Sequence, residues 1–274
     1  MGSVQTLKFS QLWNTLFACI LILFCSCKKN ENLVGFDVTQ NGQTITSPPS
    51  LDYKLVFLDD FLGYSLDTTK WNYRSLGQWR QAVNTKDAII LDGNGNLVIK
   101  TYRIGSTVYT GMIDTRNRFD FKYGYFECRV KLQQRLGLWS AYWLLPYRFT
   151  DGSSPLTDGT EIDIFEHFVR NGPDIFKNDL WWGGYGSLQT NGPRVCRLPG
   201  LSSGFHTFGF EWTPTENIFS VDGYRSWSSV LGISQQREFL ILSCEVQDNA
   251  AGVINDPNFQ DQLVIDYVKV YSKE

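Results

Sequence analysis

With 274 residues, 42% of them hydrophobic, the chain is long enough to bury one sizeable core, and all-β sandwiches of 200 to 250 residues commonly form a single domain. The net charge of −3, with Lys and Arg mixed among Asp and Glu, offers no basic surface that could neutralise a phosphate backbone, so nucleic acid is excluded as an expected partner. The aromatic share of 15% includes nine Trp, and flat apolar rings beyond the needs of a core suit a sugar-binding groove.

Residues 1–27 predict an export signal. Lys8 supplies positive charge, and residues 16–24 form an apolar run that is too short to span a bilayer. The run ends in Phe24-Cys25-Ser26-Cys27 before two lysines, which resembles a bacterial lipobox with Cys27 as the lipidated residue. We therefore expect an exported protein of the bacterial cell envelope or surface, whose only membrane contact is a lipid anchor at Cys27. Plain cleavage and secretion is the alternative.

Residues 28–50 are rich in Asn, Gln, Thr, Ser and Gly and predict a flexible linker, so we expect the folded domain to span residues 51–274. Three cysteines remain in that domain, an odd number that cannot pair completely within one chain. Cys128 and Cys244 lie in strand-like apolar contexts and are expected to be small core residues, whereas the pairing of Cys196 stays open.

Short runs of alternating apolar and polar residues recur between Gly, Asn, Asp and Pro, and no run of ten or more residues keeps a helical period. The domain is therefore expected to be all β, as two packed antiparallel sheets with one broad face left as a groove. The expected strands include residues 96–102, 125–132, 205–212, 238–244 and 263–271. Asp92-Gly93, Asn94-Gly95 and Asp222-Gly223 are hairpin-type turn signals.

Acidic residues concentrate in one strand-like segment. Glu161 and Asp163 would point to the same face of a strand, with Ile162 and Ile164 toward the core. Glu166 stands five positions after Glu161, so a regular strand would turn it to the opposite face. A β-bulge near Ile164 or Phe165 would return it to the face of the other two acids.

Three acids on one face point to chemistry more than to a solvated strand, because their mutual repulsion costs stability. Cleavage of a glycosidic bond with retention needs a nucleophilic carboxylate and a protonated carboxylic acid on either side of that bond. A Ca²⁺ site is the less favoured reading, since three oxygens from one strand seldom encircle an ion that takes six to eight ligands. We expect no metal and no cofactor.

The segment Glu161-Ile162-Asp163-Ile164-Phe165-Glu166 resembles the active-site signature of glycoside hydrolase family 16, in its bulged, laminarinase-like form. The resemblance extends in chain order over most of residues 51–274, through segments 55–61, 66–73, 123–131, 137–146, 205–214, 221–223 and 266–271. It implies a concanavalin-like β-jelly-roll with an open cleft.

By this resemblance Glu161 is the nucleophile, Asp163 an assisting acid, and Glu166 the general acid and then base. The expected substrate-binding residues are Trp139, Trp143, Trp181, Trp182, Tyr185, His167 and Glu245. Trp181 stands where the family usually carries His, so an apolar contact replaces a polar one.

The resemblance implies a retaining endo-hydrolase of β-1,3- or mixed β-1,3/1,4-glucans. We expect a monomer with a polysaccharide as its partner. Hydrolysis of red-algal galactans is the runner-up on the same fold, with Arg80 and Arg116 as groups that could meet sulfate. Transglycosylation ranks lower, because the plant-type enzymes that perform it resemble the form without the bulge. From a different class, a non-catalytic carbohydrate-binding sandwich would keep the tryptophans, but it would not need all three acids.

Overall fold

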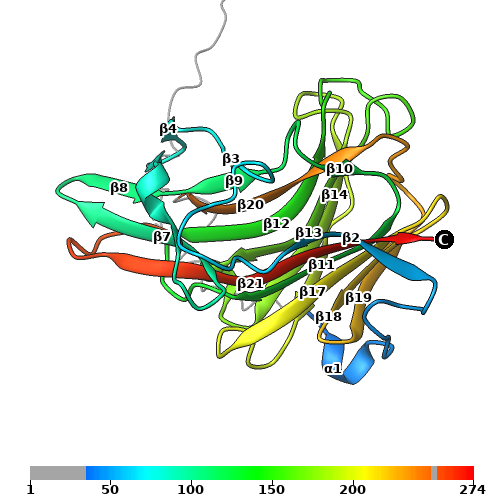
Figure 1. The fold of residues 1–274 in the computed structure, drawn as a ribbon, viewed down its shortest axis with the longest axis horizontal. Coiled ribbons are helices and arrows are strands. Elements are labelled where there is room, and N and C mark those ends of the chain that lie inside the picture. Colours follow the sequence, from blue (N-terminus) through cyan, green and yellow to red (C-terminus); the bar gives the residue numbers. More distant parts are fainter. Residues whose placement is uncertain (1–34, 248–251) are drawn as a thin grey trace, which may run out of the picture. The chain divides into compact units, whose positions relative to one another are not determined.

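The computed structural model describes residues 35–247 and 252–274, which form a sandwich of two mainly antiparallel sheets (Figure 1). The expected all-β jelly-roll is confirmed. The described helical segments are short: α1 (Val38–Asn41) and two 3₁₀ turns, Lys86–Ala88 and Val169–Asn171. None of the described helices is long and apolar enough to cross a membrane.

The first sheet has ten strands and carries the acidic segment. Along the sheet these are β1 (Phe36–Asp37), β16 (Arg194–Arg197), β14 (Ile175–Trp182), β13 (Glu161–Phe168), β12 (Leu138–Pro146), β20 (Glu238–Val246), β9 (Met112–Asp114) and β3 (Asn72–Tyr73), with β10 (Asp120–Phe121) on β20 and β15 (Thr190–Asn191) on β14. β13 therefore lies in the interior of the sheet, between β12 and β14, where neighbours on both sides fix its register.

The second sheet has eleven strands and covers the other side of the core. Along the sheet these are β19 (Tyr224–Ser229), β18 (Asn217–Val221), β17 (Phe205–Trp212), β11 (Gly124–Lys131), β21 (Gln260–Lys273), β7 (Leu97–Ile104), β8 (Thr107–Thr110), β5 (Ala82–Asn84) and β4 (Gly77–Trp79), with β2 (Tyr53–Asp59) on β21 and β6 (Ile89–Leu91) on β7. The expected hairpins are confirmed: residues 92–96 join β6 to β7, and Asp222-Gly223 joins β18 to β19.

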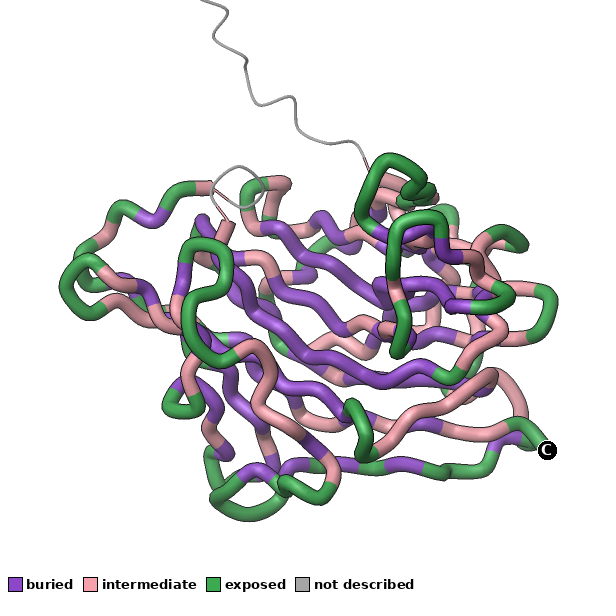
Figure 2. The backbone as a smooth tube through the Cα atoms, turned by 90° about the horizontal axis from the view of Figure 1, so that it is seen from above, coloured by how far each residue is buried: buried purple, intermediate pink, exposed green. Residues whose placement is uncertain are grey.

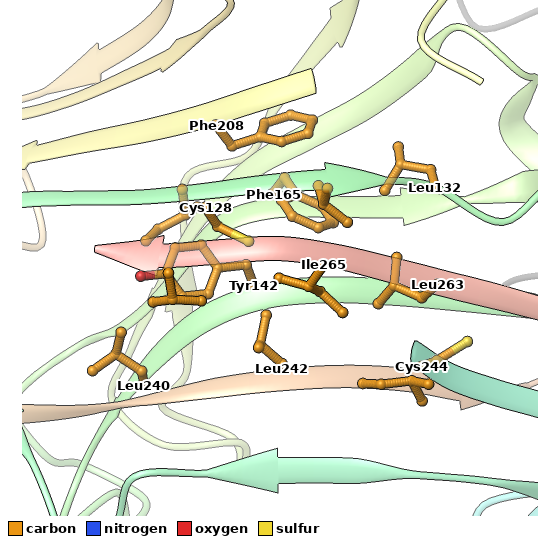
Figure 3. Packing of buried hydrophobic residues seen from close by; sticks show 14 of the residues in the cluster. Cys128, Leu132, Tyr142, Phe165, Phe208, Leu240, Leu242, Cys244, Leu263 and Ile265 are labelled. Carbon is orange, nitrogen blue, oxygen red and sulfur yellow. The ribbon is translucent and has the colours of Figure 1, made fainter. Parts of the chain in front are cut away.

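One hydrophobic core fills the space between the sheets, so that the backbone of the central strands is buried and the connecting loops are exposed (Figure 2). Phe165 of β13 packs on Phe208 of β17 with ring centroids 4.3 Å apart (Figure 3). Burial of each such ring contributes about 1.5–3 kcal/mol. Cys128 and Cys244 belong to this core, as predicted, and Cys196 is also buried and unpaired.

The prediction of a flexible linker over residues 28–50 was wrong for the part that the structure describes. Phe36 and Asp37 pair in parallel with β16, and Asp37 caps α1 through the backbone N–H groups of Thr39 and Gln40. Further along, the backbone N–H of Ile45 donates to the carbonyl of Gly223. Val38 of α1 is fully buried in the core, so side-chain burial and backbone pairing together hold this otherwise polar segment. The expected signal peptide and Cys27 lie outside the described residues.

Candidate active site

A β-bulge in β13 brings the three predicted acids to one face. Asp163 pairs with Asp179 and Glu166 pairs with Lys177, so three steps along β13 match two along β14. The register against β12 shifts in the same place. The extra residue is Ile164, whose carbonyl accepts a hydrogen bond of 2.6 Å from the Asn178 side chain. The predicted bulge is confirmed, and the Asn178 amide supplies a partner for a carbonyl that lies where the pairing is interrupted.

The acids lie in a cleft of about 600 Å³ on the first sheet. Of the predicted residues, Glu161, Asp163, Glu166, Trp139, Trp143, Trp181, Tyr185 and Glu245 line it. The other lining residues are Arg74, Trp79, Arg80, Met112, Ala141, Leu145 and Gln189. An aromatic cleft with carboxylates on its floor suits a chain of sugar rings, whose apolar faces pack on flat side chains while acids reach the linkage.

Burial and mutual repulsion raise the pKa values of the three acids. Burial is the main cause in each case, and it raises the pKa of Glu161 to about 7 and that of Glu166 to about 8. The pKa of Asp163 is raised well above its usual range by burial and then by the charges of Glu166 and Glu161. The site therefore holds protons at neutral pH, as a catalytic acid requires.

Glu161 has neighbours that favour its ionised form. The Tyr185 hydroxyl donates a hydrogen bond to its carboxylate and lowers its pKa, as does the positive charge of Arg74. After burial, the charge of Asp179 is the largest cause that raises the pKa of Glu166, and it also raises the pKa of Glu161, while Lys177 lowers the pKa of Glu166. The pKa of Glu161, about 7, lies below that of Glu166, about 8.

Asp179 is a fourth acid that the sequence reasoning missed. It is 2% exposed, and burial raises its pKa to about 6. One ligand oxygen each from Asp163, Glu166 and Asp179 lies within 4.8 Å of the others, the only such group in residues 35–247 and 252–274. Three oxygens are half or fewer of the six to eight that Ca²⁺ takes. Alternation along β14 places Asp179 on the same face as Trp181, a signal that could have identified it.

Trp139 and Trp143 line the cleft in different surroundings. Phe168 stacks on Trp139 with centroids 4.7 Å apart, and the Arg80 guanidinium lies 4.7 Å from the Trp139 ring centroid. Trp143 donates through its indole N–H to the Ser243 hydroxyl at 3.2 Å. Trp139 is thus held by two stacking neighbours, and Trp143 by a hydrogen bond to β20.

The structure corrects two predicted substrate contacts, His167 and Trp182, neither of which lines the cleft. His167 follows Glu166 on β13, is fully buried, and its Nδ1 lies 2.8 Å from the Ile175 carbonyl. Trp182 follows Trp181 on β14 and packs against the core. Successive side chains of a strand point to opposite faces, so a residue next to a cleft residue faces the core.

A larger groove of about 840 Å³ lies along β7 and β21 of the second sheet. The acids that line this groove are Asp87 and Asp261, and within the described residues they form no cluster of three carboxylates like the one around β13. Asp261 already accepts hydrogen bonds from the backbone N–H groups of Gln134 and Arg135. The cleft on the first sheet is therefore the candidate active site.

A jelly-roll whose open cleft combines aromatic walls with buried, proton-holding carboxylates defines a glycoside hydrolase. The family model of the glycosyl hydrolases family 16 matches residues 76–229, and the chain belongs to that family. It is an O-glycosyl hydrolase.

Individual relatives agree with this assignment. The chain is 31% identical over 266 residues to a β-glucanase of Rhodothermus marinus, an alignment that covers 87% of this chain and 91% of the relative. It superposes on a laminarinase from Flavobacterium sp. UMI-01 with a TM-score of 0.69 at 24% identity, over 80% of this chain and 100% of that one. A second structure, from work on endo-acting O-glycanases of the human gut microbiota that initiate mucin breakdown, gives a TM-score of 0.72 at 21% identity, over 85% and 94%. These two structural likenesses establish the fold.

Proposed function

We propose that this chain is a retaining endo-hydrolase of β-1,3- or mixed β-1,3/1,4-glucans, with Glu161 as nucleophile and Glu166 as acid and base. The observation that carries the proposal is the bulge at Ile164, which places both residues on the floor of one aromatic cleft. A strand without the bulge would leave Glu166 on the core side.

In the first step a Glu161 oxygen bonds to the anomeric carbon while the glycosidic C–O bond breaks. The proton of Glu166 passes to the departing oxygen, which leaves as a sugar hydroxyl. In the second step Glu166 removes a proton from water, the water oxygen bonds to the anomeric carbon, and Glu161 departs as a carboxylate. The neighbours of Glu161 support its role, because Tyr185 and Arg74 favour its ionised form, and burial supports the role of Glu166, because it favours the protonated form.

Asp163 is proposed as the assisting acid. Its raised pKa keeps it protonated, and a protonated carboxyl can donate a hydrogen bond to a neighbouring carboxylate. Through that bond it would steady the charge of Glu161 before attack and again on departure. No cofactor is required by this mechanism.

An uncharged substrate fits the electrostatics of the cleft. Both arginines that line it are paired with acids: Arg74 with Asp114 at 2.8 Å, and Arg80 with the buried Glu245. A sulfated galactan would need cations free to meet its sulfates. The pairing therefore favours a neutral glucan, in keeping with the similarity to a β-glucanase and a laminarinase.

Product analysis tests the proposal. The chain is incubated with laminarin, mixed-linkage β-glucan, agarose, porphyran, κ-carrageenan and mucin O-glycans, and reducing ends and product sizes are followed. We expect a ladder of oligosaccharides from the two glucans alone. Oligosaccharides from a galactan or from mucin without glucan cleavage would refute the glucan assignment, and no cleavage of any substrate would favour a binding module.

We further infer export and anchoring through Cys27, and action as a monomer. Export and anchoring are supported by the apolar run of residues 16–24 and the Cys27-Lys28-Lys29 sequence that follows it. Labelling of bacterial cells with a palmitate analogue tests the anchor: the chain should be labelled and Cys27→Ala should not. Light scattering of the purified chain tests the monomer.

A further inference from the structure

Trp79 projects into the cleft from outside the first sheet. It ends β4, which pairs with β5 as a short hairpin, and its ring lines the same cleft as the catalytic acids while remaining 38% exposed. Trp79 adds to a cleft lining that already includes Trp139, Trp143 and Trp181, and contiguous apolar surface in a groove marks a binding site. The prediction of sugar contacts from sequence did not include it.

Glu245 holds this ring in place from β20. The indole N–H of Trp79 donates to a Glu245 carboxylate oxygen at 2.7 Å, and Arg80 pairs with the same oxygen. Glu245 is 4% exposed and lies in register with Trp139 on β12. A buried carboxylate with two donors fixes both neighbours firmly, because leaving it unpaired would be costly.

The backbone at the tip of the hairpin supports the same arrangement. Arg80 has φ of +50°, in the left-handed region that residues other than glycine seldom adopt. Next to it, the backbone N–H of Gln81 donates to the Val246 carbonyl, and an Arg80 nitrogen donates to the Gln247 side chain at 2.8 Å. Contacts with three consecutive residues at the end of β20 thus hold Trp79 and Arg80 at the rim of the cleft.

Arg80 also lies near both tryptophans. Its guanidinium lies 4.7 Å from the ring centroid of Trp139 and 5.8 Å from that of Trp79. Since Glu245 neutralises Arg80, the surface beside Trp79 suits an uncharged ring.

We propose that Trp79 is a sugar-stacking platform of an additional subsite, which binds a glucose ring away from the cleaved bond, and that Glu245 is its positioning residue. The inference rests on the proposed glucanase function. The hydrogen bond fixes the indole before a ligand binds. A sugar ring therefore packs on Trp79 without the entropy cost of ordering that side chain.

A variant series on the full chain tests this inference. We expect Trp79→Ala to raise KM for laminarin about tenfold, the loss of about 1.4 kcal/mol of binding, with kcat within about twofold of the parent. Trp79→Phe should raise KM for laminarin by less than about threefold. A short aryl disaccharide that does not reach the additional subsite should be cleaved unchanged, and Tyr64→Ala, which removes an exposed ring outside the cleft lining, should match the parent.

Glu245 variants test the positioning role. Glu245→Ala should raise KM for laminarin as Trp79→Ala does, and the double variant should show no further loss, because both changes remove one platform. Glu245→Gln keeps an acceptor for the indole and should stay within about threefold of the parent. Additive losses in the double variant would contradict the positioning role.

The outcomes separate this inference from the proposed function. A parent chain that cleaves no β-glucan would overturn both. A parent that cleaves glucan while Trp79→Ala leaves KM unchanged would overturn the platform alone. Equal losses on laminarin and the disaccharide would show that Trp79 only supports the fold, and would overturn it as well.

Discussion

The Tyr185 hydroxyl donates a hydrogen bond to the carboxylate of Glu161 from the loop that follows β14. This contact joins a cleft wall to the acid at the start of β13, and it stabilises the charged form of that acid. Phe149 packs edge-on against the Tyr185 ring with centroids 4.7 Å apart and holds it in this position. A residue outside the acidic motif therefore helps to set the ionisation of the proposed nucleophile.

Tyr185→Phe should move the acidic limb of the kcat/KM profile to higher pH. Removing the donor leaves the Glu161 carboxylate less stabilised, so its pKa rises further and a smaller fraction is ionised at a given pH. Hydrogen bonds to charged groups contribute about 1.5–3 kcal/mol, so kcat/KM near neutral pH should fall roughly tenfold or more. An unchanged acidic limb would exclude Glu161 as the group that titrates there.

Glu161→Ala should abolish turnover, with a loss of about 10⁴-fold or more in kcat, while glucan binding is retained. The covalent step has no other carboxylate in the same place. Affinity electrophoresis in glucan gels and reducing-end release check the two parts separately. Preserved turnover would refute the nucleophile assignment.

Glu166→Ala should lower kcat by about 10²- to 10⁴-fold, as expected for the loss of a general acid and base. Added azide should restore part of the rate, because a small anion can enter the vacated space and attack the glycosyl-enzyme without a base. The rate of azide-dependent release is the measurement. If kcat does not fall and azide has no effect, Glu166 is not the general acid and base.

The acidic segment was predictable from local pattern, because alternation and the five-residue offset of Glu166 together require a bulge. The strands and hairpins were predictable for the same reason, since apolar alternation and Asp-Gly turns act over a few residues. His167 and Trp182 were mistaken for cleft residues because each adjoins one, and their faces depend on where the bulge resets the alternation.

Contacts between segments far apart in the sequence could not be predicted. Trp79 and Glu245 meet only because the β4–β5 hairpin lies beside the end of β20, and the hydrogen bond between them spans 166 positions. Residues 35–45 likewise have the composition of a linker, yet backbone pairing with β16 and with residues near β19, together with the burial of Val38, orders them. Composition does not encode such a pairing.

Asn178→Ala should destabilise the fold and lower kcat. Its amide donates to the Ile164 carbonyl at the bulge, and its own oxygen accepts from the Ser226 hydroxyl at 2.7 Å. Because these buried groups lose their partners, we expect the free energy of unfolding to fall by about 1–3 kcal/mol. Urea unfolding measures this loss. Ser226→Ala is the matched control, because it removes only the second bond. We expect it to lose stability with kcat unchanged, and an equal loss of kcat in both variants would contradict a specific role for the bulge contact.

Glu238→Gln should become more stable than the parent as pH rises. Glu238 is fully buried beside Thr160, whose backbone N–H donates to it at 3.1 Å, and burial raises its pKa to about 8. Between the unfolded value near 4.5 and about 8, the folded state binds more protons than the unfolded state, so this group makes the unfolding free energy fall with rising pH, by up to about 1.4 kcal/mol per pH unit. Glutamine keeps the acceptor and cannot ionise. Urea unfolding at pH 5 and pH 8 should therefore show a difference between variant and parent that grows at the higher pH. A pH-independent difference for Glu238→Gln would rule out burial of a protonated acid at this position.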